Sequence, residues 1–472
     1  MTYDDFIASK QIQTLEHGLS QSQIKPINKM LYPFQRDIVA WAIKKGRAAI
    51  FADCGMGKTA IQLQWAAQVP GRVIVVAPLA VGQQTVREGE KFGVQCEYSR
   101  TDSGAQIVVT NYEMLDKFNP GDFTGIVLDE SSILKSHSGK FRNYLIREWG
   151  GLDYRLAATA TPAPNDHMEL GNHSEFLGAM TRMEMLSMFF VHDGGDTQKW
   201  RLKGHARSEF WKWVCSWAVM IRKPSDLGYN DDKFDLPECN VHECIVESAA
   251  ESSEFLFRLP ALTLSERLNA RRDTIQERCS AAVEIIGSRP NEPWLVWCNL
   301  NTESQTITRM IPDAVEVAGS NTIDQKESRM NGFSGGAHRV LVTKPSIAGH
   351  GMNWQHCHNM VFVGLSDSWE QYYQAVRRCW RFGQIQPVHT WIVISDLEGA
   401  VLQNIRRKED ESAVMADSML RHMHAMNKAN INGESTHDKR YYPCEIPTIP
   451  AFLSSANNRA RTGQHTLETV AR

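Results

Sequence analysis

The sequence lacks the features that mark most nucleic-acid-binding and membrane proteins. It has 51 Lys and Arg residues against 54 Asp and Glu residues, which gives a net charge of −3 at pH 7. A protein that grips a phosphate backbone usually has a basic excess over the binding domain, so this balance alone argues against a nucleic-acid partner. No apolar run approaches the roughly 18 residues that a membrane span needs, and no solenoid or collagen repeat is visible.

The sequence also lacks the cysteine pattern of a zinc site. Its ten cysteines include no C-x-x-C pair. The nearest approaches to a metal site are Cys239 with His242 and Cys244, and the His-Cys-His run at 356–358, and neither has the matching second half of a zinc site. The stretch 1–11 carries acidic residues in place of the basic region of a secretory signal. We therefore expect reduced thiols in a soluble protein of the cytoplasm, with no membrane partner.

What the sequence does have is two regions in which short apolar segments alternate with helical patterns. Such segments, bounded by Gly, Asp or Pro, predict buried parallel strands in two separate α/β layers. A chain of 472 residues has room for two or three domains of roughly 100–200 residues. The predicted strands are 48–51, 72–76, 106–109, 125–128 and 154–158 in the first region and 294–297, 339–342, 360–363 and 390–394 in the second.

The stretch between these regions is predicted to be helical. Its apolar residues at 210, 213, 214, 217, 218 and 221 have the spacing of one helix face. A tryptophan-rich stripe could stack on bases, but this spacing favours core packing. A second helical pattern covers 271–286, and the segment from His422 onward, rich in polar residues and broken by prolines, is predicted to be loosely ordered.

A phosphate-binding loop is predicted at 52–59, between the first strand and a helical pattern. The segment reads A-D-C-G-M-G-K-T and matches G-x-x-x-x-G-K-[ST] except for Ala52 in the first position. In this motif Gly55 and Gly57 let backbone N–H groups cradle the β-phosphate, Lys58 reaches the β- and γ-oxygens, and Thr59 ligates Mg²⁺. Short matches arise by chance, but the strand–loop–helix context is the one that the motif predicts.

Two further elements fit a nucleotide site. The D-E-S-S segment follows the fourth strand of the first region, where Asp129 could hold the Mg²⁺ shell and Glu130 could polarise the attacking water. A helix N-cap is the alternative interpretation of D-E-S-S, and the upstream loop favours the nucleotide site. Gln35, in L-Y-P-F-Q, offers the donor and acceptor that adenine's N6/N7 edge requires, although an isolated Gln carries no such meaning.

The second region supplies arginines. Arg378 and Arg381 are three residues apart, which predicts that they share one helical face. An isolated arginine cluster is usually a solvated basic turn. However, a site built only from the first region lacks a cation for the charge that develops on the γ-phosphate, and an arginine from a facing domain supplies it.

These segments together resemble the ordered motifs of superfamily 2 helicases. The residues of these motifs are most similar to those of the Swi/Snf-type ATPases and, within them, to those of the small DEAD-like helicases encoded by phages and prophages. The motifs, in order, are L-Y-P-F-Q, A-D-C-G-M-G-K-T, V-V-A-P-L, V-V-T-N-Y-E, L-D-E-S-S-I-L-K-S, A-T-A-T-P-A-P-N, I-R-K-P-S-D with F-D-L-P, A-G-H-G-M-N and Q-A-V-R-R-C-W-R-F-G-Q. The resemblance implies two tandem RecA-like domains at 28–185 and 246–400, with an extension at 1–27, a helical insertion at 186–245, and a helix and tail at 401–472.

The resemblance also implies an ATP-dependent DNA helicase or translocase that uses ATP and Mg²⁺ in the cytoplasm of a bacterial host, with a phage replication or recombination protein as a further partner. An RNA helicase, or a slow ATP-gated nucleic-acid clamp that does not translocate, are the alternatives. By position, Arg378 and Arg381 would be arginine fingers. Thr159 and Thr161 would couple hydrolysis to movement, and Thr110, Thr343 and Lys344 would contact nucleic acid. The nucleotide would be contacted by Gln35, Gly55, Met56, Gly57, Lys58, Thr59, Asp129, Glu130, Gly351 and Asn353.

The chain departs from the family pattern in three places. Ser132 stands where relatives usually have His or Asp, Ala160 where the Swi/Snf type usually has Gly, and His350 where an apolar residue is usual. None of these removes a group that hydrolysis needs. The chain lacks the large insertions of chromatin remodellers, so nucleosome remodelling is not implied. If basic groups such as Lys344 gather at one cleft, the net charge of −3 predicts modest, salt-sensitive, ATP-dependent binding of nucleic acid.

Overall fold

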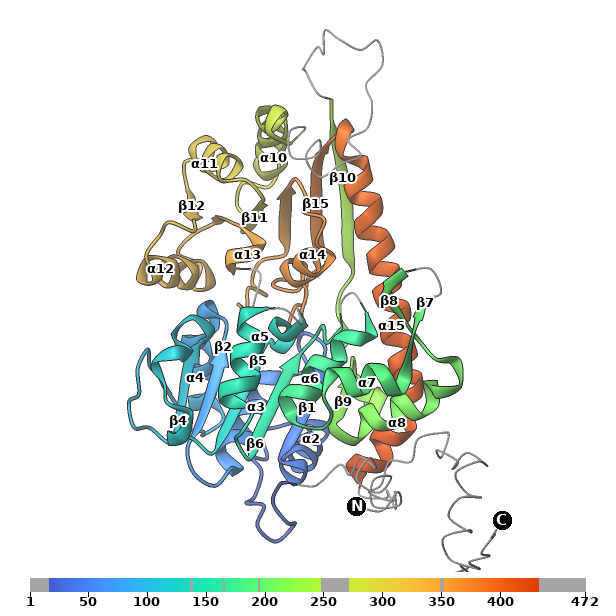
Figure 1. Cartoon of the computed structure of the whole chain (residues 1–472). Helices are drawn as coiled ribbons and strands as arrows, with labels where there is room; N and C mark the ends of the chain where they lie inside the picture. Colours follow the sequence, from blue (N-terminus) through green and yellow to red (C-terminus); the bar gives the residue numbers. More distant parts are fainter. Residues whose placement is uncertain are drawn as a thin grey trace, which may run out of the picture.

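Two α/β domains make up the part of the chain that the structure describes. In this computed structural model, that part comprises residues 17–135, 139–163, 166–193, 196–247, 271–348 and 352–432. The N-terminal domain is the lower one in Figure 1 and the C-terminal domain the upper one, and each contains a parallel sheet flanked by helices. This arrangement confirms the predicted fold class of two tandem RecA-like domains.

The first sheet has seven parallel strands, and all of them except the two-residue strand at one edge are buried on both faces. In sheet order these are β3 (Glu97–Tyr98), β4 (Ile107–Asn111), β2 (Val73–Ala77), β5 (Gly125–Asp129), β6 (Tyr154–Thr159), β1 (Arg47–Ala52) and β9 (Ala218–Ile221). The helices are α2 (Pro33–Lys45), α3 (Lys58–Gln68), α4 (Gly82–Lys91), α5 (Lys140–Tyr144), α6 (Leu170–Leu177), α7 (Arg182–Phe189) and α8 (Arg207–Trp217). Helices α2 and α3 cover one face and α6, α7 and α8 the other, which explains why the strands are almost continuously apolar.

The second sheet has six parallel strands. In sheet order these are β10 (Cys239–Val246), β15 (Val388–Ser395), β14 (Asn359–Val363), β11 (Trp294–Cys298), β13 (Val340–Thr343) and β12 (Ala314–Val317). The helices are α10 (Ile275–Gly287), α11 (Asn301–Met310), α12 (Ile323–Ser334), α13 (Pro345–Ala348), α14 (Trp369–Val376) and α15 (Gly399–Asn432). Helices α10 and α11 pack on one face, and α12, α13 and α14 on the other.

All nine predicted strand segments form strands, but the helix predicted at 210–221 is wrong at its end. Helix α8 stops at Trp217, and the next four residues form β9, which pairs with β1 at the edge of the first sheet. A short, continuously apolar run fits either structure by spacing alone. Trp213 and Trp217 are buried in the core, which confirms core packing over base stacking.

The stretch 186–245 therefore contributes to both sheets, because β9 joins the first and β10 the second. It also contains the antiparallel pair β7 (Phe190–Asp193) and β8 (Asp196–Leu202). The domain boundaries given above remain predictions.

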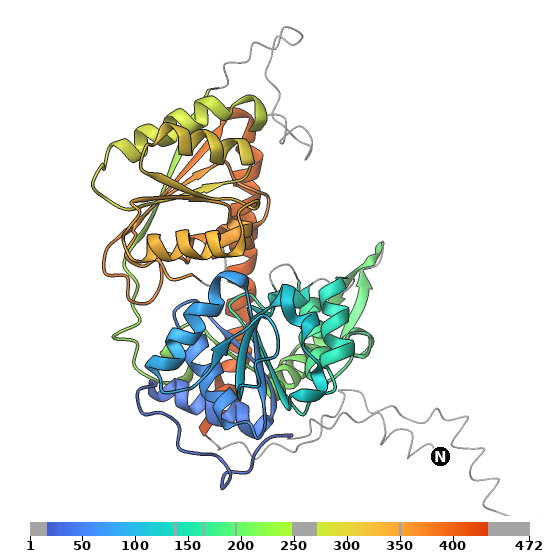
Figure 2. The ribbon, with the colours of Figure 1, turned by 90° about the vertical axis from the view of Figure 1, so that its left-hand side faces the viewer.

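Helix α15 spans the two domains. Figures 1 and 2 show it running from the end of the second sheet down along the first domain. Its start packs into the second domain through Val401 and Ile405, and its later part into the first through Met419 and Met423. The helix continues to Asn432, past the point where the sequence predicts a loosely ordered tail, and 433–472 lie outside the described residues.

Two negative findings hold for the residues that the structure describes. None of their helices is both long enough and apolar enough to cross a membrane. Nine of the ten cysteines lie in the described ranges, and these nine form no disulfide.

Candidate functional site

The phosphate loop connects β1 to α3. Gly55 and Gly57 have φ values of 92° and 79°, which glycine adopts without strain. A Cβ atom on Gly57 would lie 2.3 Å from Nε2 of Gln35, and one on Gly55 would lie 2.8 Å from the backbone N and Cβ of Phe382 in the second domain. The loop therefore needs both glycines, and it ends at the N-terminus of α3, where backbone N–H groups favour an anion.

The polar side chains in and beside the loop are bonded to nearby backbone groups. Lys58 Nζ donates to the carbonyl of Ala52 at 2.9 Å, so the ammonium lies against the loop. Thr59 follows it in the first turn of α3. Gln35 Nε2 donates to the Met56 carbonyl at 2.9 Å, and its Oε1 accepts the Tyr32 N–H at 2.9 Å. A glutamine amide has a second N–H and a second lone pair, so Gln35 keeps one donor and one acceptor for adenine.

Asp129 and Glu130 lie at the carboxyl end of β5, beside the loop. Gln62, one turn after Lys58 on α3, donates to Asp129 Oδ1 at 2.7 Å, and Tyr112 Oη donates to the Asp129 carbonyl at 2.7 Å. Burial and the charge of Glu130 raise the pKa of Asp129 to about 6, against the opposite effects of Gln62 and Lys58. Two buried carboxylates side by side are a site for a cation.

Glu130 has an unusual backbone and begins a chain of hydrogen bonds. Among the described non-glycine residues it alone has positive φ, 55°, a strained conformation that often occurs at functional sites. Its Oε2 accepts from Thr159 Oγ1 at 3.4 Å, and Thr159 Oγ1 accepts the Thr161 N–H at 3.1 Å. Thr161 Oγ1 in turn lies 3.3 Å from Glu370 Oε1 on α14, and Lys135 also pairs with Glu370. The two predicted coupling residues thus connect Glu130 to the second domain.

The predicted arginine face is wrong in its local structure. Helix α14 ends at Val376, and Arg378 and Arg381 lie in the turn that follows. At the end of the helix, the Arg378 N–H donates to the Ala375 carbonyl, three residues back, at 3.2 Å. The Gln374 carbonyl, four residues back, accepts instead from the Arg378 side chain at 2.8 Å. Both arginines still lie together, since each donates through Nη1 to the Met352 carbonyl, at 3.2 Å for Arg378 and 3.1 Å for Arg381.

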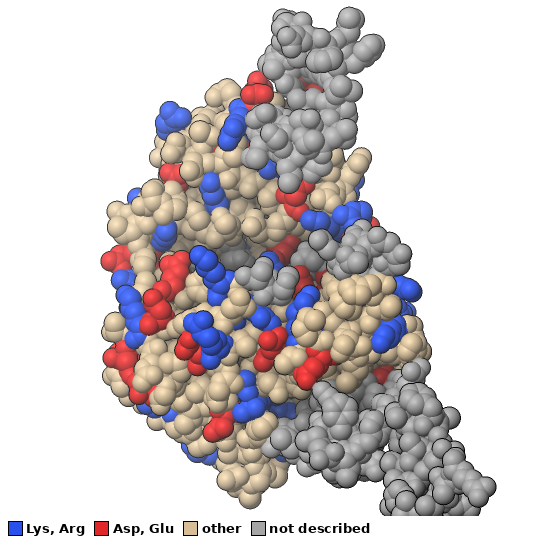
Figure 3. Space-filling model, viewed as in Figure 1, with Lys and Arg blue, Asp and Glu red and all other residues tan. Residues whose placement is uncertain are grey.

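The remaining predicted contacts differ in accessibility. Gly351 lies outside the described residues, and Asn353 Oδ1 accepts the Gln355 N–H at 3.4 Å. Thr110 and Thr343 are fully buried, and Thr343 Oγ1 donates to the Val317 carbonyl at 3.0 Å. Lys344 is partly exposed, so a nucleic-acid strand would meet it before either threonine. On the face in Figure 3, basic and acidic side chains are mixed over both domains.

Three residues at the junction of the domains were missed by the sequence interpretation. Asp53, inside the phosphate loop, pairs with Arg377, and Tyr373 Oη donates to Asp53 Oδ1 at 2.5 Å. Arg377 adjoins the two predicted arginines in V-R-R-C-W-R, so the motif pointed to the segment without distinguishing its members.

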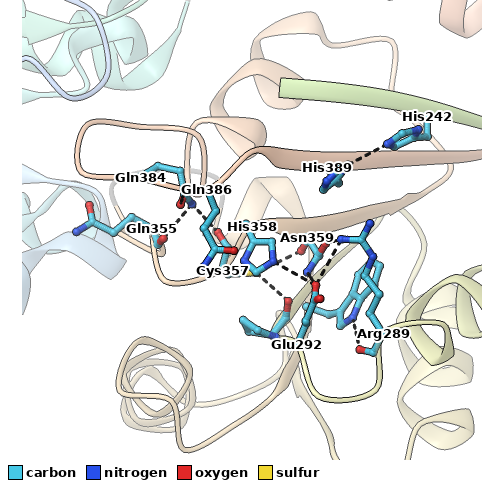
Figure 4. Close-up of polar contacts among 12 residues, drawn as sticks. His242, Arg289, Glu292, Gln355, Cys357, His358, Asn359, Gln384, Gln386 and His389 are labelled. Carbon is cyan, nitrogen blue, oxygen red and sulfur yellow. Dashed lines mark hydrogen bonds and ion pairs between the residues drawn. The ribbon is translucent and has the colours of Figure 1, made fainter. Parts of the chain in front are cut away.

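The cysteine–histidine segments that came nearest to a metal pattern are engaged in other contacts. Figure 4 shows His358 bonded to Glu292 at 3.1 Å and His242 bonded to His389 at 3.1 Å. The Cys357 thiol donates to the Asn359 carbonyl at 3.2 Å. Within the described ranges, no three His, Cys, Asp or Glu side chains are grouped as metal ligands.

Part of the second domain matches a known protein family. Residues 277–383 match the helicase conserved C-terminal domain. The protein named DNA annealing helicase and endonuclease ZRANB3 from Mus musculus is 22% identical to this chain, over 78% of the chain and 38% of its own length. The Bos taurus protein of the same name gives the same identity and shares. These similarities support a superfamily 2 helicase, and the chain spans 38% of the length of these curated relatives.

Proposed function

We propose that the protein is an ATP-dependent DNA helicase or translocase. The observation that carries the proposal is the contact between Gly55 of the phosphate loop and Phe382, the residue after Arg381. Through it, the segment that carries Arg378 and Arg381 lies against the loop of the first domain, and that loop lies beside Asp129. The name of the matched relatives, a DNA annealing helicase, favours DNA as the polymer.

The residues present fit a magnesium nucleotide. The glycines form a cradle that a Cβ atom would fill, and hydroxyl and carboxylate oxygens are the ligands that Mg²⁺ prefers. Thr59 and Asp129 would hold the ion, which when bound offsets the negative charge of the phosphates. Lys58 would exchange the Ala52 carbonyl for the phosphate oxygens. Glu130 would take the proton of the water that attacks the γ-phosphorus, and Arg378 and Arg381 would stabilise the charge on the γ-phosphoryl oxygens.

Hydrolysis would be coupled to motion through the bonds that link Glu130, Thr159, Thr161 and Glu370. Loss of the γ-phosphate changes the partners of Glu130, and this chain of contacts would pass the change to α14. The two domains would then step along backbone phosphates with little sequence preference. The resemblance to small phage-encoded helicases supports a role in phage or prophage DNA metabolism, alongside a replication or recombination protein.

The proposal is tested by ATP hydrolysis with different polymers. We expect single-stranded or duplex DNA to stimulate the wild type, and Lys58→Ala to be inactive with every polymer. Stimulation by RNA alone would favour the RNA helicase, and full activity of Lys58→Ala would refute the site. ATP-driven displacement of a third strand from a triplex separates a translocase from a clamp, since a clamp hydrolyses ATP without displacing the strand.

A further inference from the structure

One face of α14 carries several polar contacts between the domains. Glu370, Tyr373 and Arg377 lie three and four residues apart, so they follow one side of the helix and its end. Glu370 reaches Thr161 and Lys135, whereas Tyr373 and Arg377 both reach the carboxylate of Asp53. We call Asp53, Tyr373 and Arg377 the Asp53 latch.

The Asp53 latch is largely buried and internally bonded. Side-chain exposure is 16% for Asp53 and 7% for Arg377. Arg377 Nε also lies 3.2 Å from Tyr373 Oη, and its guanidinium lies 4.8 Å from the ring centre of Trp380. Burial and Asp53 hold the pKa of Tyr373 well above its usual value, so the phenol stays a donor. Truncating one partner of such a pair leaves the other charge buried and uncompensated.

Another ion pair between the domains, at the surface, provides a contrast. Arg100 and Asp324 are 3.0 Å apart, with side-chain exposures of 42% and 84%. Exposed pairs of this kind contribute little because water screens them. The Asp53 latch is therefore the stronger of these two charged ties between the domains.

The latch holds the second domain over the phosphate loop. Asp53 is two residues before Gly55, and the Cys54 N–H donates to Asp53 Oδ1 at 2.6 Å, so the carboxylate is fixed to the loop. The same segment that carries Arg377 brings Phe382 against Gly55. In this arrangement Lys58 bonds to the loop's own carbonyl. A phosphate in the loop would compete with the Ala52 carbonyl for Lys58, beside the Phe382 side chain that lies against Gly55.

A cavity beside the latch gives its side chains room to move. It has a volume of about 240 Å³ and is lined by Asp53, Tyr373 and Arg377 together with Thr161 and residues of α15 such as Met415 and Met419. Arg377 can therefore leave Asp53 without displacing a packed core.

We infer that the Asp53 latch is an autoinhibitory contact that holds Phe382 against the phosphate loop and must open for a nucleoside diphosphate or triphosphate to bind. This inference rests on the proposed function. Tyr373 and Arg377 are positioning residues, because they act through Asp53 and through the segment that carries Phe382. Breaking the latch from either side should therefore favour the nucleotide-bound state.

Simple charge effects predict something different. Removing the negative charge of Asp53 would strengthen phosphate binding, whereas removing the positive charge of Arg377 would weaken it. The latch instead predicts the same direction for both changes. It also predicts that the double variant gains no more than the larger single one, since the contact can be broken only once.

The test is the dissociation constant of MgADP, measured by calorimetry on the full chain for Asp53→Asn, Arg377→Gln and the double variant. We expect each to bind about three- to tenfold more tightly than the wild type, without additivity. Opposite signs, unchanged binding or multiplicative effects would overturn the latch. Arg100→Gln and Asp324→Asn are the matched controls and should leave binding unchanged.

If the Arg377→Gln variant does not fold, the Tyr373→Phe variant replaces it, because this change removes only one hydroxyl from the same contact. Tighter MgADP binding by Tyr373→Phe supports the latch, and unchanged binding refutes the latch. Absence of MgADP binding by the wild type would refute the proposed function itself, whereas binding with the wrong pattern among variants refutes only the latch.

Discussion

The two sides of the interdomain cleft hold their charged residues in different ways. In the first domain, Asp129 and Glu130 are bonded to side chains of neighbouring elements, Gln62 and Thr159. In the second domain, Arg378 and Arg381 both donate to one backbone carbonyl, that of Met352. The arginines of the second side are bonded within their own domain, and Arg381, which uses one of its five N–H donors on Met352, keeps other donors for a phosphate.

Both sides nevertheless carry like charges close together. Burial and Glu130 raise the pKa of Asp129 to about 6, and burial and Arg378 lower the pKa of Arg381 to about 10. Each shift records a charge that its surroundings do not fully compensate. A cation would relieve the first pair and an anion the second, which is the complement that a magnesium nucleotide offers.

The largest effect is expected at Glu130. Glu130→Gln removes the proton acceptor and keeps the shape, so turnover should fall about 1,000-fold while MgADP affinity changes little. Steady-state hydrolysis and calorimetry measure the two quantities. The control is Glu113→Gln, an exposed carboxylate after β4, which should hydrolyse ATP at the wild-type rate. Turnover within tenfold of wild type in Glu130→Gln would assign the base to another residue.

The two arginines should separate by function. Arg381→Ala should lower turnover about 100-fold with little loss of nucleotide binding, because a finger acts on charge in the transition state. Arg378 is almost fully buried. It donates two hydrogen bonds to Gln374 and one to Met352. Arg378→Ala should therefore also lower the free energy of unfolding by about 3 kcal/mol.

Urea denaturation and hydrolysis rates distinguish these outcomes. An Arg381→Ala variant with wild-type turnover would remove it as a finger. An Arg378→Ala variant as stable as the wild type would show that its bonds to Gln374 and Met352 are dispensable, and that the two arginines are equivalent.

The sequence predicted those parts of the site that local patterns encode. The phosphate loop and the Asp129–Glu130 pair follow strands whose β-branched residues make them recognisable. The Asp53 latch joins residues more than 300 positions apart, and no local spacing pairs Asp53 with Arg377. The edge strand β10 was missed because His242 and Glu243 interrupt its apolar residues, and β9 because its apolar run continues the spacing of α8.

The packing beneath the D-E-S-S segment should depend on pH. Burial lowers the pKa of His173 to about 4, and its Nε2 lies 3.1 Å from Ser131 Oγ. Because the folded pKa is below the unfolded value of about 6.5, the stability that neutral His173 contributes is present above pH 6.5 and is lost as pH falls toward 4. From pH 7.5 to 5 this loss amounts to about 2 kcal/mol.

Urea denaturation at several pH values measures this dependence. His173→Gln should lose about 2 kcal/mol less than the wild type between pH 7.5 and 5, since the other titrating groups are shared. Ser131→Ala keeps the imidazole and should retain most of the wild-type slope. Equal slopes for His173→Gln and the wild type would show that His173 does not titrate in this range.

The smallest effect tests the junction of the two sides at Gly55. Gly55 and Gly93 both have positive φ, and a Cβ atom at Gly93 would meet nothing within 4 Å, whereas one at Gly55 would press on Phe382. Gly93→Ala should cost only the backbone strain, about 1 kcal/mol, and Gly55→Ala about 1 kcal/mol more through overpacking. Thermal denaturation measures the difference. Equal losses of stability in the two variants would mean that Phe382 moves away from Gly55 at little cost. The second domain would then be held against the phosphate loop less firmly than the Asp53 latch implies.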